Sequence, residues 1–235
     1  MPTGLQVKND DGEINIDEEY RNFSLKTQGT ATIGTTNIGG SVALYNATIQ
    51  VTNCTSPILA LRATTSVSVV GTQVSGSTYT FDVYSNTSNH TFNYYVFDVP
   101  TAPADTFGLQ VFNSSGDLVF HSSNKHMKIA YVYNANDGGS SGNTLASGKT
   151  YAVVQGAVGW RNKNFLRLGT WRYIAIAAGH KFTGTTLYLN WPTIGIAAPA
   201  NRELLVDEVN PSADSFAYEY TPQTPKFLVL DVTNY

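Results

Sequence analysis

The sequence predicts an all-β protein made of two tandem, diverged β-sandwich-like domains that arose by internal duplication. Three observations predict it: a composition that favours strands, a motif that occurs twice, and short alternating apolar runs along the chain. The 235 residues include 14 Tyr and 11 Phe, whereas charged residues make up only 13%, about half the usual share. Thr, Ser, Asn and Gly take the place of charged residues, and this mixture favours strands and turns over helices.

A motif near the N-terminus returns near the middle of the chain. Gly-Leu-Gln-Val-x-Asn-x-x-Gly begins at Gly4 and again at Gly108, 104 positions later (108 − 4), with six identities in nine positions. Leu-x-Val indicates a strand with one buried face, and Asn-x-x-Gly indicates a turn in which Gly has a positive φ. Each copy is therefore expected to open with a β-hairpin, with Leu5, Val7, Leu109 and Val111 facing inward.

The two copies also end alike. Residues 94–99 and 227–232 are both apolar runs with an acid at the fifth position, Asp98 and Asp231, which lie 133 positions apart (231 − 98). An acid that occurs at the same place in both copies points to a structural role, such as accepting hydrogen bonds from backbone amides at a strand end. A catalytic acid would not need to occur twice.

A proline-containing segment separates the copies and suits no central strand. We place the domain boundary there, with a first β-sandwich-like domain at 1–102 and a second at 103–235. The second copy has longer loops. Residues 134–148, rich in Gly, Ser and Asn, are predicted to be one of them.

Strand-sized runs, punctuated by Gly, Asn or Ser, fill the space between these landmarks. The return strands of the two hairpins are predicted at 13–17 and 117–121. Further strands of the first copy are predicted at 30–38, 42–51, 58–62, 67–74 and 79–84. Those of the second copy are predicted at 128–133, 150–158, 166–176, 186–191, 202–206 and 216–220.

Charge and cysteine content argue against several classes of function. The net charge is −3 and Lys and Arg form no block, so a nucleic-acid partner is not expected. The one cysteine, Cys54, has no partner for an internal disulfide and is predicted to be a small buried residue. The polar, acidic start lacks the features of a secretory signal, and no apolar run has the length of a membrane span. Synthesis in the cytoplasm without membrane insertion is expected.

No motif for catalysis or for a cofactor is present in the sequence. The four histidines have no metal-ligand spacing and are predicted to be solvated at strand ends. No Gly-x-Ser-x-Gly elbow occurs, and the Gly-rich segment 138–142 lacks the Lys of a phosphate-binding loop. We therefore predict no catalytic, metal-binding or cofactor-binding residue, and no enzymatic activity.

The second copy holds all three tryptophans, and arginines lie beside them. Trp160 with Arg161 and Trp171 with Arg172 are the candidate contacts, because Trp and Arg are common at protein interfaces and aromatic rings stack on sugars. Three interpretations remain open for them: core packing, a subunit interface, and contact with a ligand.

The segment 107–123 carries a resemblance to a known family. It reads Gly-Leu-Gln-Val-Phe-Asn-Ser-Ser-Gly, then an apolar strand, then His121-Ser122-Ser123. This run resembles the opening of small tail proteins of tailed bacteriophages, and the run from Gly4 is similar to it. Residues 57–62, Pro-Ile-Leu-Ala-Leu-Arg, also resemble a strand of these proteins. Asp17-Glu18-Glu19 departs from the motif in the first copy, which leaves open whether both copies face the same neighbour.

The resemblance implies a structural component of the virion tail, placed at the tail tip, the baseplate or a fibre. Its implied partners are other tail proteins, such as the central fibre, the hub or the baseplate, in a symmetric assembly with several copies. It supplies no catalytic residue. The alternative is an adhesin of the tail that binds a host receptor or carbohydrate.

Overall fold

The computed structural model describes residues 6–8, 14–17, 20–38, 43–102, 107–134, 142–157, 160–167, 170–190, 193–197, 216–220 and 226–235. These residues form strands and connections and contain no helix, so the all-β class is confirmed. In the first half the strands are β1 (Gln6–Lys8), β2 (Ile14–Asp17), β3 (Ser24–Thr32), β4 (Tyr45–Val51), β5 (Ile58–Arg62), β6 (Ser68–Ser75), β7 (Thr78–Ser85) and β8 (Thr91–Asp98).

In the second half the strands are β9 (Gln110–Phe112), β10 (Leu118–His121), β11 (Ile129–Asn134), β12 (Gly142–Thr144), β13 (Tyr151–Ala157), β14 (Trp160–Arg167), β15 (Thr170–Ala177), β16 (Gly179–Thr183), β17 (Thr186–Asn190), β18 (Thr193–Ala197), β19 (Phe216–Tyr220) and β20 (Lys226–Asp231). Of these, β14, β15, β18 and β19 are described by their backbone alone.

One layer of the molecule is a six-stranded antiparallel sheet with the order β11-β20-β13-β5-β8-β3. The facing layer consists of two three-stranded sheets, β4-β7-β6 and β12-β17-β16. A backbone bridge between Val67 and His180 links these two sheets, with N–H···O distances of 3.0 and 2.9 Å. Both layers therefore continue from the first half of the chain into the second.

Three apolar clusters fill the interior. One lies between β5, β8 and the sheet β4-β7-β6, and includes Leu61, Phe81 and Val96. The second lies between β13, β20 and the sheet β12-β17-β16, and includes Leu187 and Phe227. Because alternate residues of a strand point to opposite faces, the other face of the six-stranded sheet carries different side chains.

The third cluster occupies that other face and belongs to both halves. Its buried residues include Ala60 and Phe97 from the first half, and Val154 and Leu230 from the second. A bridge between Ser24, at the start of β3, and His126, just before β11, brings the two ends of the sheet together over this cluster. The sheet is therefore partly closed around a core that neither half completes alone.

The two halves have the same strand order in both layers. In the six-stranded sheet each half supplies an outer, a middle and an inner strand: β3, β8 and β5 in the first, and β11, β20 and β13 in the second. In the facing layer, β4-β7-β6 corresponds to β12-β17-β16. The inner strands β5 and β13 pair antiparallel, with Val153 opposite Leu61 and Val154 opposite Ala60. This arrangement corresponds to an approximate two-fold axis between β5 and β13.

Equivalent strands also share their register, as the outer strands show. In β3 and β8, Leu25 lies opposite Phe97, a bulge follows, and Thr27 lies opposite Val96. In β11 and β20 the same pattern is formed by Ile129 opposite Leu230, a bulge, and Tyr131 opposite Val229. The offsets, 104 for the outer strands (129 − 25) and 133 for the middle strands (230 − 97), equal those of the sequence landmarks. Chance would rarely reproduce a bulge at the same position.

The six-stranded sheet crosses the predicted domain boundary at 102/103, because β5 and β13 come from different sides of it. The halves 1–102 and 103–235 are thus not separate in space: they share a sheet and a core. Their division into two duplicated domains stays a prediction.

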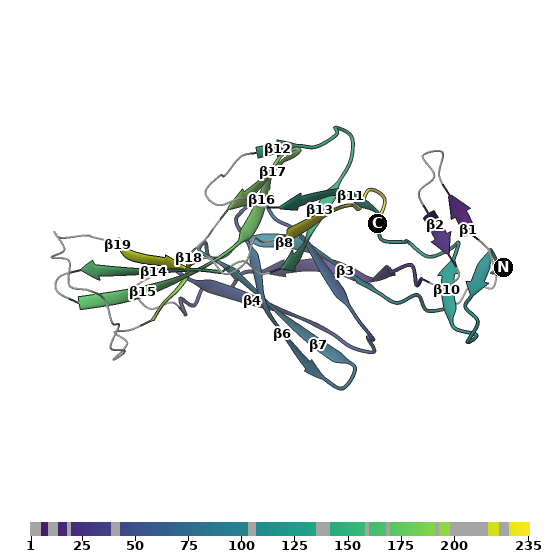
Figure 1. Cartoon of the computed structure of the whole chain (residues 1–235), viewed down its shortest axis with the longest axis horizontal. Coiled ribbons are helices and arrows are strands. Elements are labelled where there is room, and N and C mark those ends of the chain that lie inside the picture. Colours follow the sequence, from purple (N-terminus) through teal and green to yellow (C-terminus); the bar gives the residue numbers. More distant parts are fainter. Residues whose placement is uncertain are drawn as a thin grey trace.

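The second half has a sheet for which the first half has no described counterpart, with the order β18-β15-β14-β19. Its strands come from two insertions, one between β13 and β16 and the other between β17 and β20. Figure 1 shows this sheet at one end of the long axis, while the hairpins containing β1, β2 and β10 lie at the opposite end. The sandwich lies between them.

Several predicted strands differ from the observed ones. Residues 166–176 are not one strand, because the chain reverses there and β14 pairs with β15 over its whole length. Residues 134–148 are not only a loop, because β12 pairs with β17. Gly142 is needed in β12, since a Cβ there would lie 2.6 Å from the side chain of Thr186. Strand β3 ends at Thr32 rather than at 38, and 202–206 lie outside the described residues.

Candidate functional site

The repeated hairpin is the candidate site, and its second copy is described in most detail. In β9 and β10, Val111 lies opposite Phe120 and Phe112 opposite Leu118, with a bulge at Val119. The first copy has the same register at the corresponding positions, with a bulge between Val7 and Lys8. The expected hairpins are therefore present at both places.

The turn of the second hairpin is built around Asn113. Its side-chain oxygen accepts hydrogen bonds from the backbone N–H groups of Ser115 (3.0 Å) and Asp117 (2.8 Å). Gly116 has a φ of 82°, a left-handed conformation that suits glycine, as the Asn-x-x-Gly motif predicts. An asparagine that binds backbone two residues later is a common way to fix a turn.

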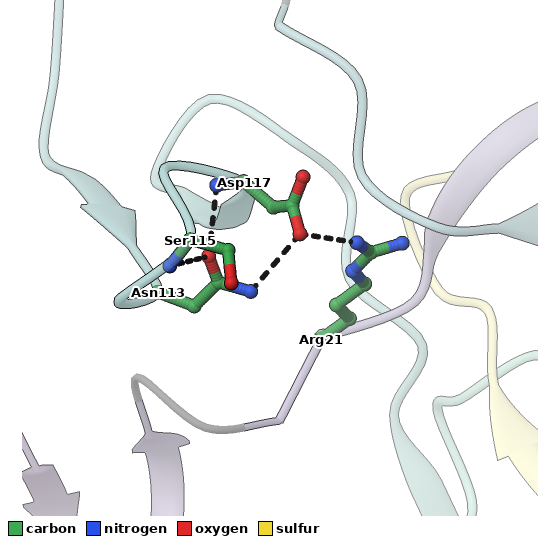
Figure 2. A network of polar contacts seen from close by, with 4 residues as sticks. All are labelled: Arg21, Asn113, Ser115 and Asp117. Atoms are coloured by element: carbon green, nitrogen blue, oxygen red, sulfur yellow. Dashed lines mark hydrogen bonds and ion pairs between the residues drawn. The ribbon is translucent and has the colours of Figure 1, made fainter.

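A chain segment from the first half holds this turn in place. Arg21 donates to the Asp117 carboxylate at 2.7 Å, and Asn113 donates to the same carboxylate oxygen at 3.1 Å; Figure 2 shows both contacts. The pKa of Asp117 is lowered, first by the hydrogen bond from Asn113 and then by Arg21. Next to Arg21, the N–H of Asn22 donates to the carbonyl of Val119 at 3.0 Å. The second hairpin is thus attached to the first half of the chain.

The base of the hairpin is buried and contains two of the histidines. His121 is fully buried, and its Nδ1 accepts a hydrogen bond from the N–H of Ser123. His126 stacks on Phe120 with ring centroids 4.4 Å apart, and its Nε2 bonds to the carbonyl of His121. The prediction of solvated histidines is wrong for His121 and for His180, which is also fully buried. Their rings are part of the core, and the burial of a histidine cannot be predicted from its residue type.

The outside of the second hairpin carries exposed apolar side chains. Phe107 is 87% exposed and Phe112 is 50% exposed, and Tyr20, in the segment that holds the turn, is 70% exposed. Val111 is buried as predicted, whereas Leu109 is 48% exposed rather than facing inward. Exposed aromatic rings of this kind are frequent where proteins contact one another.

The sequence-predicted contact residues all lie in the inserted sheet. Trp160 lies opposite Ala177 and Arg161 opposite Ile176, whereas Trp171 lies opposite Leu166 and Arg172 opposite Phe165. Six positions of β14 separate Trp160 from Leu166 (166 − 160), which is about 20 Å at strand spacing. The structure therefore places the two Trp-Arg pairs toward opposite ends of one hairpin.

The Asn-x-x-Gly motif predicted the turn, but the ion pair of Arg21 with Asp117 was not predicted. A signal was present, because the 104-residue offset relates Arg21 to Lys125 and Asp117 to Glu13, with the charge kept at both positions. Glu13 lies outside the described residues.

Among the described residues, no three His, Cys, Asp or Glu side chains are grouped so that they could hold a metal ion. No helix in the described part of the chain is long and apolar enough to cross a membrane. The buried carboxylate of Asp98 has its oxygens bound to backbone amides, which leaves it a structural role. No protein-family model, curated protein or solved structure matches this chain.

Proposed function

We propose that this chain is a structural component of a phage virion tail, at the tail tip, the baseplate or a fibre. The observation that carries the proposal is the hairpin motif, whose resemblance to small tail proteins extends over both copies. Both hairpins keep one register, and the second displays exposed aromatic rings outside the sandwich. Such a surface suits protein–protein contact better than catalysis.

We also propose that the two halves are diverged β-sandwich-like domains from one duplication. The repeated motif, the matching strand order of both layers and the bulge at equivalent places support this. A chain with two related halves can occupy two equivalent positions around a symmetry axis. This property suits a symmetric tail in which several copies contact the central fibre, the hub or the baseplate.

No enzymatic activity, cofactor, nucleic-acid partner or membrane insertion is part of the proposal. The protein would be made in the host cytoplasm and would be located in the tail. Its shared core and long hydrogen-bonded sheets would give a part that needs no disulfide to stay folded outside the cell.

The test is mass spectrometry of purified particles, in which the chain should be found in fixed copy number. Particles should incorporate less of the variants Phe107→Ser and Phe112→Ser if the hairpin makes the contact. Val74→Ser serves as the matched control, because Val74 is a similarly exposed apolar residue on β6, away from the hairpins. Complete absence of the chain from particles would refute the tail function.

The inserted sheet favours a second candidate, a tail adhesin for a host receptor or carbohydrate. This sheet lies at the end of the molecule opposite the hairpins and carries both Trp-Arg pairs (Figure 1). The adhesin hypothesis expects Trp160→Ala and Trp171→Ala to weaken glycan binding and host adsorption without removing the chain from particles. Unchanged adsorption by both variants would count against it.

A further inference from the structure

The six-stranded sheet has two outer strands, β3 and β11, and their edges differ in chemistry. Each pairs with one strand, β3 with β8 and β11 with β20, within the part of the chain that the structure describes. The start of β3 is also bridged, through Ser24, to His126, so its outer edge is open only beyond that point. The outer edge of such a strand presents a row of N–H and C=O groups to which another strand can add. Because β3 and β11 are equivalent in register, they can be compared position by position.

The edge of β3 carries a lysine where β11 carries an alanine. Lys26 occupies the bulge of β3, and its Nζ donates to the carbonyl of Asn53 at 2.8 Å. Ala130 occupies the equivalent bulge of β11 and is exposed. Lysine is a frequent protection against edge-to-edge pairing. No residue from Ile129 to Asn134 is charged.

The apolar surface also differs between the two edges. In β11, Ile129 is 52% exposed and Val132 is 61% exposed. Val132 lies opposite Leu228, which packs against the core that both halves share, so the apolar surface continues from that core to the edge. In β3 the position of Val132 is taken by Gln28, a polar residue.

We propose that β11 pairs antiparallel with β11 of a second copy of this chain, so that the six-stranded sheets of two copies join into one. A strand is the occupant that matches a row of backbone donors and acceptors at a sheet edge. The fold already joins two related edges in this way, through β5 and β13. An uncharged β11 meets its own copy without repulsion, and Ile129 and Val132 become covered by it.

This pairing does not depend on the proposed tail function, since it is a property of the purified chain. It is measured by sedimentation equilibrium of the 235-residue, 25.4 kDa chain over a range of concentrations. A reversible dimer is expected. A protein that stays monomeric throughout the range overturns the inference. Pairing of β11 with a strand of a different protein, in place of a second copy, also overturns it. Neither result affects the presence of the chain in particles.

Substitutions on the two edges supply the specific test. Two variants add a charge to β11: Val132→Lys and Ala130→Lys, the latter placing a lysine where β3 already has one. Each should raise the dimer dissociation constant by at least about tenfold, because pairing buries an ammonium group. Gln28→Lys is the matched control on β3 and should leave the dimer dissociation constant unchanged. All three sites are exposed, so thermal unfolding should confirm that the variants fold. Equal weakening by Gln28→Lys, or no weakening by Val132→Lys, overturns the assignment of the edge.

Cross-linking gives a second readout that does not rely on weakening the dimer. Val132→Cys should yield a covalent dimer with a short bismaleimide cross-linker, while Gln28→Cys should not. The native Cys54 is buried and should stay unmodified in both variants. Cross-linking through position 28 but not through position 132 would contradict the proposed pairing.

Discussion

Asp98 and Asp231 end equivalent strands, and each carboxylate accepts hydrogen bonds from backbone amides close to it. Asp98 is 2% exposed and binds the N–H groups of Thr55 and Ser56, at 2.9 and 2.8 Å, just before β5. For Asp231, burial alone would raise the pKa, but hydrogen bonds from Lys149 and Thr233 outweigh it and hold the pKa at about 2. Asp98 thus binds the backbone of the loop that leads into β5, whereas Asp231 contacts the loop before β13 through the Lys149 side chain.

Replacing Asp98 by Ala should lower the free energy of unfolding by about 3 kcal/mol, because buried amide donors lose a charged acceptor. Asp231→Ala should cost less, about 1 kcal/mol, since its ion pair with Lys149 is partly exposed and such pairs contribute little. Urea unfolding monitored by Trp fluorescence measures both. An Asp231→Ala variant less stable than Asp98→Ala would contradict this order.

His180 should make the junction between the halves sensitive to acid. Burial lowers the pKa of His180 to about 4, although the hydrogen bond from Nε2 to the carbonyl of Leu61 opposes this shift. The ring packs against Phe182 and Phe227, and the Arg62 guanidinium lies over the Phe182 ring.

The unfolded chain therefore binds a proton at His180 below pH 6.5, whereas the folded chain binds it only near pH 4. The stabilisation is complete above pH 6.5 and decreases by about 3 kcal/mol as the pH falls to 4. Urea unfolding at several pH values should show this slope, and His180→Gln should flatten it. An equal slope in the variant and in the unmodified protein would contradict the assignment.

Cys54 should be unreactive in the folded protein. It is buried, and burial followed by the nearby Asp98 raises the pKa of its thiol. Labelling with a chromogenic disulfide at pH 8 should be at least about 100-fold slower than in urea, because it requires local opening. Asp98→Ala should speed the labelling, since it releases the loop of Thr55 and Ser56. Rapid labelling of the unmodified protein would show that the site is open.

The sequence was sufficient for features that depend on local chemistry. The hairpins followed from the Asn-x-x-Gly turn, and β5 was predicted with its observed bounds because a short apolar run stands between clear breaks. The role of Asp98 in binding amides followed from its recurrence. For the hairpins and β5 the information lies within a few residues of the feature, and for Asp98 it lies in the repeat.

Features that depend on distant pairing were not predictable in this way. The contact of β5 with β13 leaves no local sign, because an inner strand shared between halves has the same apolar pattern as a strand within one domain. The reversal of the chain within 166–176 was not predicted, because apolar and polar residues alternate on both sides of it. The burial of His180 depends on packing between halves, which residue type does not reveal.

Two substitutions in the turn network of the second hairpin distinguish the electrostatic contribution to stability from the hydrogen-bond contribution. The ion pair of Arg21 with Asp117 has side chains 40% and 49% exposed, so Arg21→Ala should lower global stability less than Asn113→Ala does. Asn113→Ala should cost about 1 kcal/mol, because two backbone N–H groups of the turn lose their acceptor.

Salt tells the two effects apart. The effect of Arg21→Ala should shrink as ionic strength rises, since exposed charges are screened, whereas that of Asn113→Ala should not. Hydrogen exchange at the amide of Asn22, which donates to Val119, reports the attachment of the hairpin directly. Both variants should speed this exchange more than exchange in β8, because the hairpin can open without the sandwich. Faster exchange in β8 to the same extent would mean that the hairpin and the sandwich unfold as one unit.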